Sequence, residues 1–106
     1  MNWEKADLRS GTIIKAEEFS RVKKPAYKVW VDFGNELGIK KTSAQITVNY
    51  SPEGLLGKAV IGVVNIPSKN IAGFISEFLL LGVVDYNGNI SLITIDQKVP
   101  NGQKVC

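Results

Sequence analysis

The sequence has 106 residues, of which 44% are hydrophobic and 22% charged, and this size and composition predict a single globular domain over residues 1–106. No apolar run approaches the roughly 20 residues of a membrane-spanning helix, and the first residues lack a signal-peptide pattern, so we expect a cytoplasmic protein without membrane insertion. Because the net charge is only +3, the distribution of charge is more informative than its total.

The residue inventory also restricts the chemistry that these 106 residues can perform. There is no histidine, and the one cysteine is the last residue, Cys106. Zinc sites built from His and Cys, and Ser-His or Cys-His catalytic pairs, are therefore excluded. The acidic residues are scattered and form no catalytic constellation. We expect a binding protein rather than an enzyme, with no metal ion or other cofactor, and we assign no role to Cys106.

The hydrophobic pattern predicts a chain made mainly of strands. A short N-terminal helix, capped by Asn2, is expected to end at Leu8. Strands are expected over residues 11–19, 27–33, 39–47 (with its end near Ser43 or Ala44), 59–66, 74–84 and 90–95. The run 59–66 is apolar on both faces, so we expect it to be buried on both sides.

The strand expected over residues 27–33 has the clearest alternation. Its inward set is predicted to belong to the core, and its outward set is predicted to be half-exposed or covered by a partner. The inward residues are Tyr27, Val29, Val31 and Phe33, and the outward residues are Lys28, Trp30 and Asp32. Since Asp32 precedes a glycine-rich turn, we expect its carboxylate to accept backbone N–H groups there or to pair with a lysine.

Turn and cap residues complete the predicted fold. Ser51 followed by Pro52 predicts one or two helical turns that end at Gly57, and Asn87-Gly88 predicts a hairpin turn. Five or six strands, with a short helix after the third, predict an all-β fold, a five-stranded OB-fold barrel with that helix between strands 3 and 4. A small SH3-like barrel is the alternative, and the position of the helix favours the OB-fold.

Two segments are candidates for binding. Residues 65–82 place a polar, glycine-containing loop between two apolar strands, which is a usual place for a binding site, although an ordinary connection is the simpler interpretation. Basic residues gather between Arg21 and Lys28 and again at Lys40-Lys41, either as a solvated surface or as a phosphate-facing patch beside Trp30. The candidates for RNA binding are Arg21, Lys23, Lys24, Lys28, Lys40, Lys41, Lys69 and Ser76.

Several segments resemble one family. Residues 7–13 (DLRSGTI) resemble the D-[LI]-R-x-G-x-[IV] opening of tRNA-binding OB domains, and VNIP at 64–67 and GFIS at 73–76 resemble two further elements of those domains. Such domains occur free-standing and as appendages of methionyl- and tyrosyl-tRNA synthetases. Within this superfamily, PAYK at 25–28, SAQIT at 43–47, IAGFISE at 71–77 and LLLG at 79–82 are similar to the CsaA family of protein-export chaperones.

The resemblance implies functions as well as a fold. A CsaA-like protein is implied to bind unfolded or pre-secretory polypeptides as a homodimer that works with the export machinery, and the wider superfamily implies tRNA as the alternative ligand. The chain has Ser76-Glu77-Phe78-Leu79 where tRNA binders have S-x-G-M, which weighs slightly against tRNA. The candidates for peptide binding are Trp30, Asn65, Phe74, Ser76, Phe78 and Tyr86.

A homodimer is also expected from the residues themselves. The doubly apolar run 59–66, together with Val83, Val84 and the short helix around Trp3, offers more apolar surface than a chain of this size has material to cover.

Overall fold

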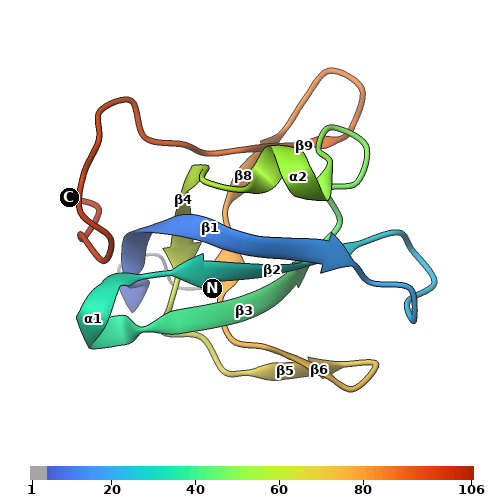
Figure 1. Ribbon diagram of the computed structural model, residues 1–106, viewed down its shortest axis with the longest axis horizontal. Helices are drawn as coiled ribbons and strands as arrows, with labels where there is room; N and C mark the ends of the chain where they lie inside the picture. Colours follow the sequence, from blue (N-terminus) through green and yellow to red (C-terminus); the bar gives the residue numbers. More distant parts are fainter. Residues whose placement is uncertain (1–4) are drawn as a thin grey trace.

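The computed structural model describes residues 5–106, and most of its regular structure is β. The elements in chain order, labelled in Figure 1 except for β7, are β1 (Leu8–Glu18), β2 (Tyr27–Asp32), α1 (Gly34–Leu37), β3 (Ile39–Ala44), α2 (Pro52–Leu55), β4 (Ala59–Val63), β5 (Lys69–Ile71), β6 (Phe74–Ser76), β7 (Leu79–Leu80), β8 (Gly82–Val84) and β9 (Ile90–Leu92). No helix over these residues is long and apolar enough to cross a membrane.

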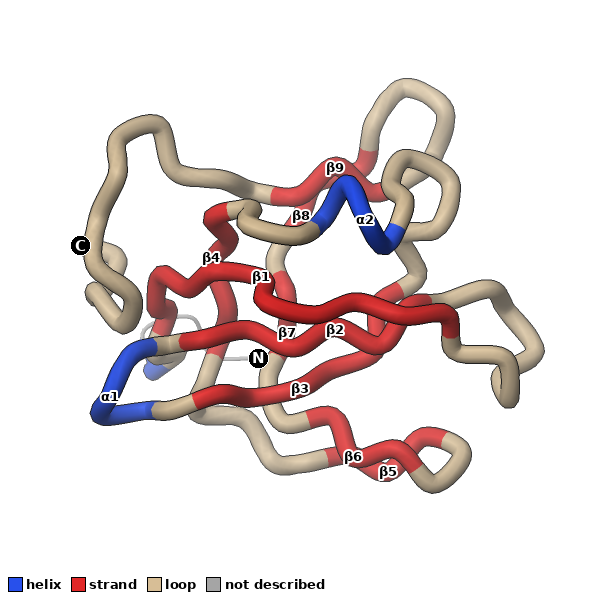
Figure 2. The backbone as a smooth tube through the Cα atoms, viewed as in Figure 1, coloured by secondary structure: helices blue, strands red, loops and turns tan. Residues whose placement is uncertain are grey.

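One antiparallel sheet forms a nearly closed barrel. Its five strands follow the order β3-β2-β1-β4-β7, and the two hairpins β5–β6 and β8–β9 lie outside it (Figure 2). The long strand β1 pairs with two neighbouring strands, since residues 8–12 pair with β4 and residues 12–18 pair with β2. A register shift between Ile13 and Lys15 marks the bulge at which β1 bends from one partner toward the other. The predicted OB-fold barrel is confirmed.

The barrel closes along a seam between β3 and residues 76–78. The Thr42 hydroxyl donates to the Phe78 carbonyl oxygen at 2.7 Å, and the Glu77 N–H donates to the Lys41 carbonyl oxygen at 2.8 Å. The Glu77 carboxylate accepts the Lys41 N–H at 3.0 Å. The two edges of the sheet therefore meet without a continuous ladder of backbone hydrogen bonds. The side chains of Thr42 and Glu77 make part of the hydrogen bonding there instead.

The core lies inside this barrel. The predicted inward residues of β2 and its continuation are all buried, and Lys28, Trp30 and Asp32 on the other face are partly exposed, as expected. Phe33 and Phe78 meet edge to face at 5.0 Å between ring centroids. Gly62 of β4 makes this pair possible, because a Cβ atom there would lie 2.7 Å from Phe33 Cζ and 2.9 Å from Phe78 Cδ2.

The predicted local signals at the turns are confirmed. Ser51 caps α2, since its hydroxyl oxygen accepts the Gly54 N–H at 3.0 Å. The Asn87-Gly88 turn connects β8 to β9 as a hairpin. Asp32 accepts the Gly34 N–H at 2.8 Å, which is the turn role expected from the sequence. The strand 39–47 ends at Ala44, and the run at 59–66 is a buried strand through Val63.

Two predictions about secondary structure are wrong. The strand expected over 74–84 is divided into β6, β7 and β8, because each part pairs with a different partner, namely β5, β4 and β9. Leu8 begins β1 rather than ending a helix, and the earlier residues of that expected helix through Glu4 lie outside the described residues. The predicted glycine-rich turn after β2 is confirmed, with positive φ at Gly34 and Gly38, and the structure adds the single helical turn α1, closed by the Gly38 N–H that donates to the Gly34 carbonyl oxygen at 2.7 Å.

The different burial of Phe78 and Tyr86, two aromatic candidates for peptide binding, can be tested by comparing the stability of their alanine variants. Phe78 is 1% exposed and Tyr86 is fully exposed. We expect Phe78→Ala to lower the free energy of unfolding by about 3–5 kcal/mol, because it leaves a cavity beside Phe33. Tyr86→Ala should change it by less than about 0.5 kcal/mol. Urea unfolding followed by circular dichroism measures both, and equal losses would contradict the assignment of Phe78 to the core.

Candidate ligand-binding face

An aromatic cluster covers the outer face of β2. Phe74, the first residue of β6, lies 5.9 Å from the Trp30 ring and 5.5 Å from the Phe19 ring, edge to face in both pairs. The three rings come from the end of β1, the middle of β2 and the β5–β6 hairpin. Phe74 thus holds the hairpin against the barrel, and it also covers part of Trp30.

Lysine side chains surround this aromatic cluster. Lys28 Nζ lies 5.0 Å from the centroid of Phe19 and 5.2 Å from that of Phe74, and Lys41 Nζ lies 5.4 Å from Phe74. Lys15 Nζ lies 4.5 Å above Trp30. Such cation–π contacts contribute about 0.5–1 kcal/mol each at exposed sites. Lys28 and Lys41 therefore help to hold the outer face together, which restricts their freedom to meet a phosphate.

The tip of the β5–β6 hairpin has an unusual backbone. Ala72 has a φ of +49° and Gly73 a φ of +85°, the positive pair that a tight two-residue hairpin turn requires. The Asn70 carboxamide oxygen accepts the Gly73 N–H at 2.9 Å and supports the turn. Positive φ is uncommon for alanine, so the tip carries backbone strain.

A basic pocket of about 500 Å³ lies between the β1–β2 loop and the hairpin tip. Its walls include Arg21, Lys23 and Lys24 on one side, and Ile71 and Ala72 on the other. The three basic side chains are exposed and take part in no ion pair within residues 5–106. This is the structural form of the basic loop predicted from the sequence.

A larger apolar groove of about 820 Å³ adjoins the basic pocket. It runs between the segment that follows β3 and the strands β7 to β9. Seven of its sixteen lining residues have large aliphatic side chains, namely Ile46, Val48, Leu79, Leu80, Leu81, Ile90 and Leu92. Val48 is 71% exposed and Leu79 is 40% exposed, so a ligand can reach apolar surface there without opening the core.

Asp85 holds one wall of the apolar groove in place. Its carboxylate accepts hydrogen bonds from the Asn49 amide and from the N–H groups of Asn87 and Asn89, each at 2.9 Å. The hydrogen bond from Asn49 contributes most to lowering the pKa of Asp85 below its ordinary value. The β8–β9 turn is thereby tied to the segment that follows β3, on the opposite side of the groove.

Of the residues predicted to bind peptide, only Trp30 and Phe74 come together. Phe78 is a core residue, 1% exposed, and this burial argues against the predicted ligand contact. Ser76 is 8% exposed, and its hydroxyl accepts the Ser43 N–H at 3.1 Å, so it takes part in the barrel seam. Tyr86 stands at the tip of the β8–β9 hairpin, outside the aromatic cluster.

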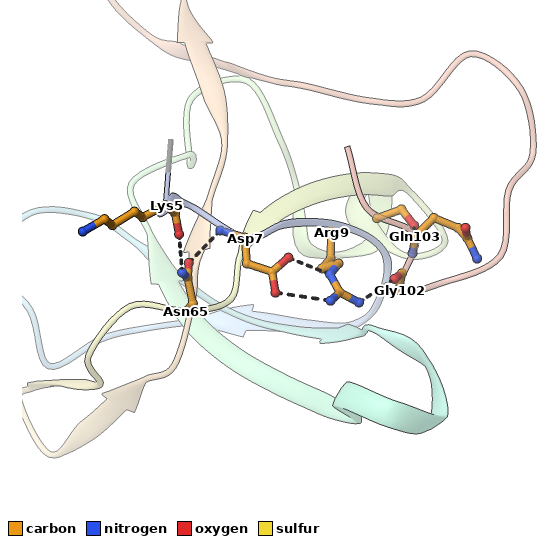
Figure 3. Close-up of polar contacts among 7 residues, drawn as sticks. Lys5, Asp7, Arg9, Asn65, Gly102 and Gln103 are labelled. Atoms are coloured by element: carbon orange, nitrogen blue, oxygen red, sulfur yellow. Dashed lines mark hydrogen bonds and ion pairs between the residues drawn. The ribbon is translucent and has the colours of Figure 1, made fainter. Parts of the chain in front are cut away.

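Asn65 has a structural role at the N-terminal end of β1. Figure 3 shows its amide donating to the Lys5 carbonyl oxygen at 2.6 Å and accepting the Asp7 N–H at 2.8 Å. Beside it, Arg9 pairs with Asp7 at 2.7 Å and donates to the Gly102 carbonyl oxygen at 3.0 Å. These groups bind one part of the chain to another, and both the oxygen and the nitrogen of the Asn65 amide are used in hydrogen bonds within the fold.

The basic residues predicted to bind RNA are divided between places. Arg21, Lys23 and Lys24 line the basic pocket, and Lys69 is exposed on β5. The expected pair Lys40-Lys41 does not share a face, because Lys40 is opposite Val31 in the register and Lys41 is opposite Trp30. Sequence reasoning missed Phe19, Lys15 and Val48. Only the family-like SAQIT run beside Val48 could have pointed to that region.

Comparisons with known proteins give three findings. The family model described as "Putative tRNA binding domain" matches residues 8–104. The methionine–tRNA ligase of Methanocaldococcus jannaschii is 38% identical over 96% of this chain, which spans 15% of that enzyme's length. Crystal structures of the CsaA chaperones of Bacillus anthracis and Picrophilus torridus are 46% and 44% identical, each with a TM-score of 0.91; they cover 99% of this chain and 94% and 95% of theirs.

The position of Phe74 over Trp30 can be measured by fluorescence. In a Trp3→Phe background, where Trp30 is the one remaining tryptophan, we expect Phe74→Ala to shift its emission to longer wavelength and to increase its quenching by iodide. The physical reason is that water replaces the covering ring. Ile75→Ala, a change of the next residue on the same hairpin, is the control and should leave the emission unchanged. An unshifted Phe74→Ala spectrum would contradict the packing described above.

Proposed function

The chain belongs to the tRNA-binding domain family, and we propose that it acts in the cytoplasm as a CsaA-like chaperone of protein export. In this proposal it binds unfolded or pre-secretory polypeptides, and it is a binding protein rather than an enzyme. The observation that carries the proposal is the apolar groove beside β7 to β9. Resemblance to proteins named as CsaA chaperones over nearly the whole of both chains supports it.

The apolar groove has the properties that a chaperone site needs. A chaperone must accept many sequences, and contact with aliphatic side chains depends on apolar area more than on a particular hydrogen-bond pattern. The groove is open, and its apolar lining comes from several segments that the barrel positions. An extended polypeptide with apolar side chains can therefore bury them there without any change in the fold.

A second function, tRNA binding, is favoured by the basic pocket. Arg21, Lys23 and Lys24 place three positive charges on one loop of an OB-fold, beside the face that such folds use for oligonucleotides. Matches to methionine–tRNA ligases support this candidate, although the chain spans only 15% of the first of them. Contacts with phosphates would make the affinity fall steeply with salt, roughly two orders of magnitude per tenfold rise for three contacts.

One experiment separates the two functions. We expect Val48→Asp to weaken binding of a denatured, reduced polypeptide by about tenfold or more, since it puts a charge in the apolar groove, and to leave tRNA binding unchanged. Lys23→Glu with Lys24→Glu should abolish tRNA binding. Fluorescence anisotropy at low and physiological salt measures both ligands.

The control for this experiment is Ile39→Asp. Ile39 is another β-branched residue, 58% exposed, that lines neither the apolar groove nor the basic pocket. Equal losses of polypeptide binding in Val48→Asp and Ile39→Asp would refute the groove as the polypeptide site. Tight tRNA binding at physiological salt that polypeptide leaves unaffected would make the chain chiefly an RNA-binding domain.

We also propose a homodimer, and the exposed apolar residues of the β8–β9 region alone support it, whereas the sequence argument also used the run 59–66. The run Ala59–Val63 is buried within the monomer, so it provides no reason for a partner. The β8–β9 hairpin does, because Val83 and Val84 are 58% and 67% exposed and Ile93 adds a third apolar side chain. Exposed apolar surface of this kind is typical of an interface.

The molar mass in solution tests the proposed dimer directly. We expect light scattering at micromolar concentration to give about twice the chain mass of 11.6 kDa, and Val83→Lys with Val84→Lys to return the monomer mass by placing charges in the interface. Val105→Lys, at a valine that is 52% exposed elsewhere on the surface, should leave the dimer intact. A monomer mass for the unchanged protein would refute the proposal.

A further inference from the structure

The apolar groove and the basic pocket adjoin one another. We propose that together they form one two-part site, selective for extended polypeptide segments in which carboxylate side chains flank apolar ones. This inference rests on the proposed chaperone function and names the class of polypeptide that the same site prefers.

The two hollows share part of their walls. Lys24 and the consecutive residues Ser43, Ala44 and Gln45 line both of them. A polypeptide seated in the apolar groove that continues past Gln45 therefore enters the basic pocket. A twelve-residue extended segment spans about 40 Å, which exceeds the longest dimension of the molecule, 35 Å, so one such segment is long enough to occupy both parts.

Every charged residue that lines the two hollows is basic. Neither hollow has an Asp or Glu in its lining, whereas Arg21, Lys23 and Lys24 all line the basic pocket. Glu18, the nearest acidic residue along the chain, lines an adjoining hollow that shares Lys23 with the basic pocket and Pro25 with the apolar groove. A carboxylate in the basic pocket would supply the countercharge that the chain lacks there, and a lysine would be repelled.

The lining favours polypeptide over nucleic acid. Single-stranded nucleic acids bind by stacking bases on exposed aromatic rings. The apolar groove has no aromatic residue in its lining, and Phe19, the one aromatic residue of the basic pocket, is 4% exposed. Trp30 lines neither hollow. The apolar part therefore suits aliphatic side chains, and the basic part suits anions attached to the same chain.

The test uses three labelled peptides of about twelve residues, long enough to span both parts. They share one central run of Leu, Val and Ala, and their flanks carry Asp and Glu, Ser and Gln, or Lys. At about 0.15 M salt we expect the acidic-flanked peptide to bind about tenfold tighter than the neutral one, and the Lys-flanked peptide to bind more weakly than either. At about 0.5 M salt the three affinities should converge.

Charge reversal assigns the preference to the basic pocket. Lys23→Glu with Lys24→Glu should place the Lys-flanked peptide first, and urea unfolding followed by circular dichroism checks that the variant is folded. Lys5→Glu with Lys98→Glu makes the same change of charge at two exposed lysines that line neither hollow, and it should keep the original order.

The outcomes separate this inference from the function on which it rests. Binding of all three peptides with equal affinity would overturn the acidic preference and leave the chaperone function standing. Failure of every peptide to bind, with tight binding of a labelled RNA, would overturn both. An acidic preference that survives in Lys23→Glu/Lys24→Glu would overturn the assignment to the basic pocket.

Discussion

The seam between β3 and residues 76–78 is the constraint on which the rest of the structure depends. Three consecutive residues of β3 are bonded across it: Lys41 to Glu77, Thr42 to Phe78, and Ser43 to Ser76. These bonds close the barrel and orient the Phe78 ring toward Phe33, which completes the core. A polar seam beside an apolar core is stable because every buried polar side-chain atom in residues 5–106 has a partner.

The same seam positions both candidate binding surfaces. Phe74 lies two residues before Ser76, and its ring packs against Trp30. Leu79 lies directly after Phe78 and lines the apolar groove. A single short segment thus separates the aromatic cluster on the outer face of the barrel from the groove. The polar groups of this segment make hydrogen bonds within the fold. The apolar groove and the basic residues of the β1–β2 loop therefore remain as the candidate binding surfaces.

Sequence reasoning succeeded where the physical cause is local. Alternation in β2 predicted its buried and half-exposed faces, Ser51-Pro52 predicted α2, and Asn87-Gly88 predicted the second hairpin. It failed where the cause is a distant partner. An apolar segment that runs from Phe74 to Val84 looks like one strand, and only the separate positions of β5, β4 and β9 divide it into three.

The sequence by itself determined the all-β barrel, the core face of β2, the basic loop and the family, because alternation, turn residues and motif spacing are properties of neighbouring residues. Tertiary structure alone decided which polar and aromatic residues remain available to a ligand. Ser76, Phe78 and Asn65 are used within the fold, and Lys24 borders both hollows, because barrel closure brings together residues that are far apart in the chain.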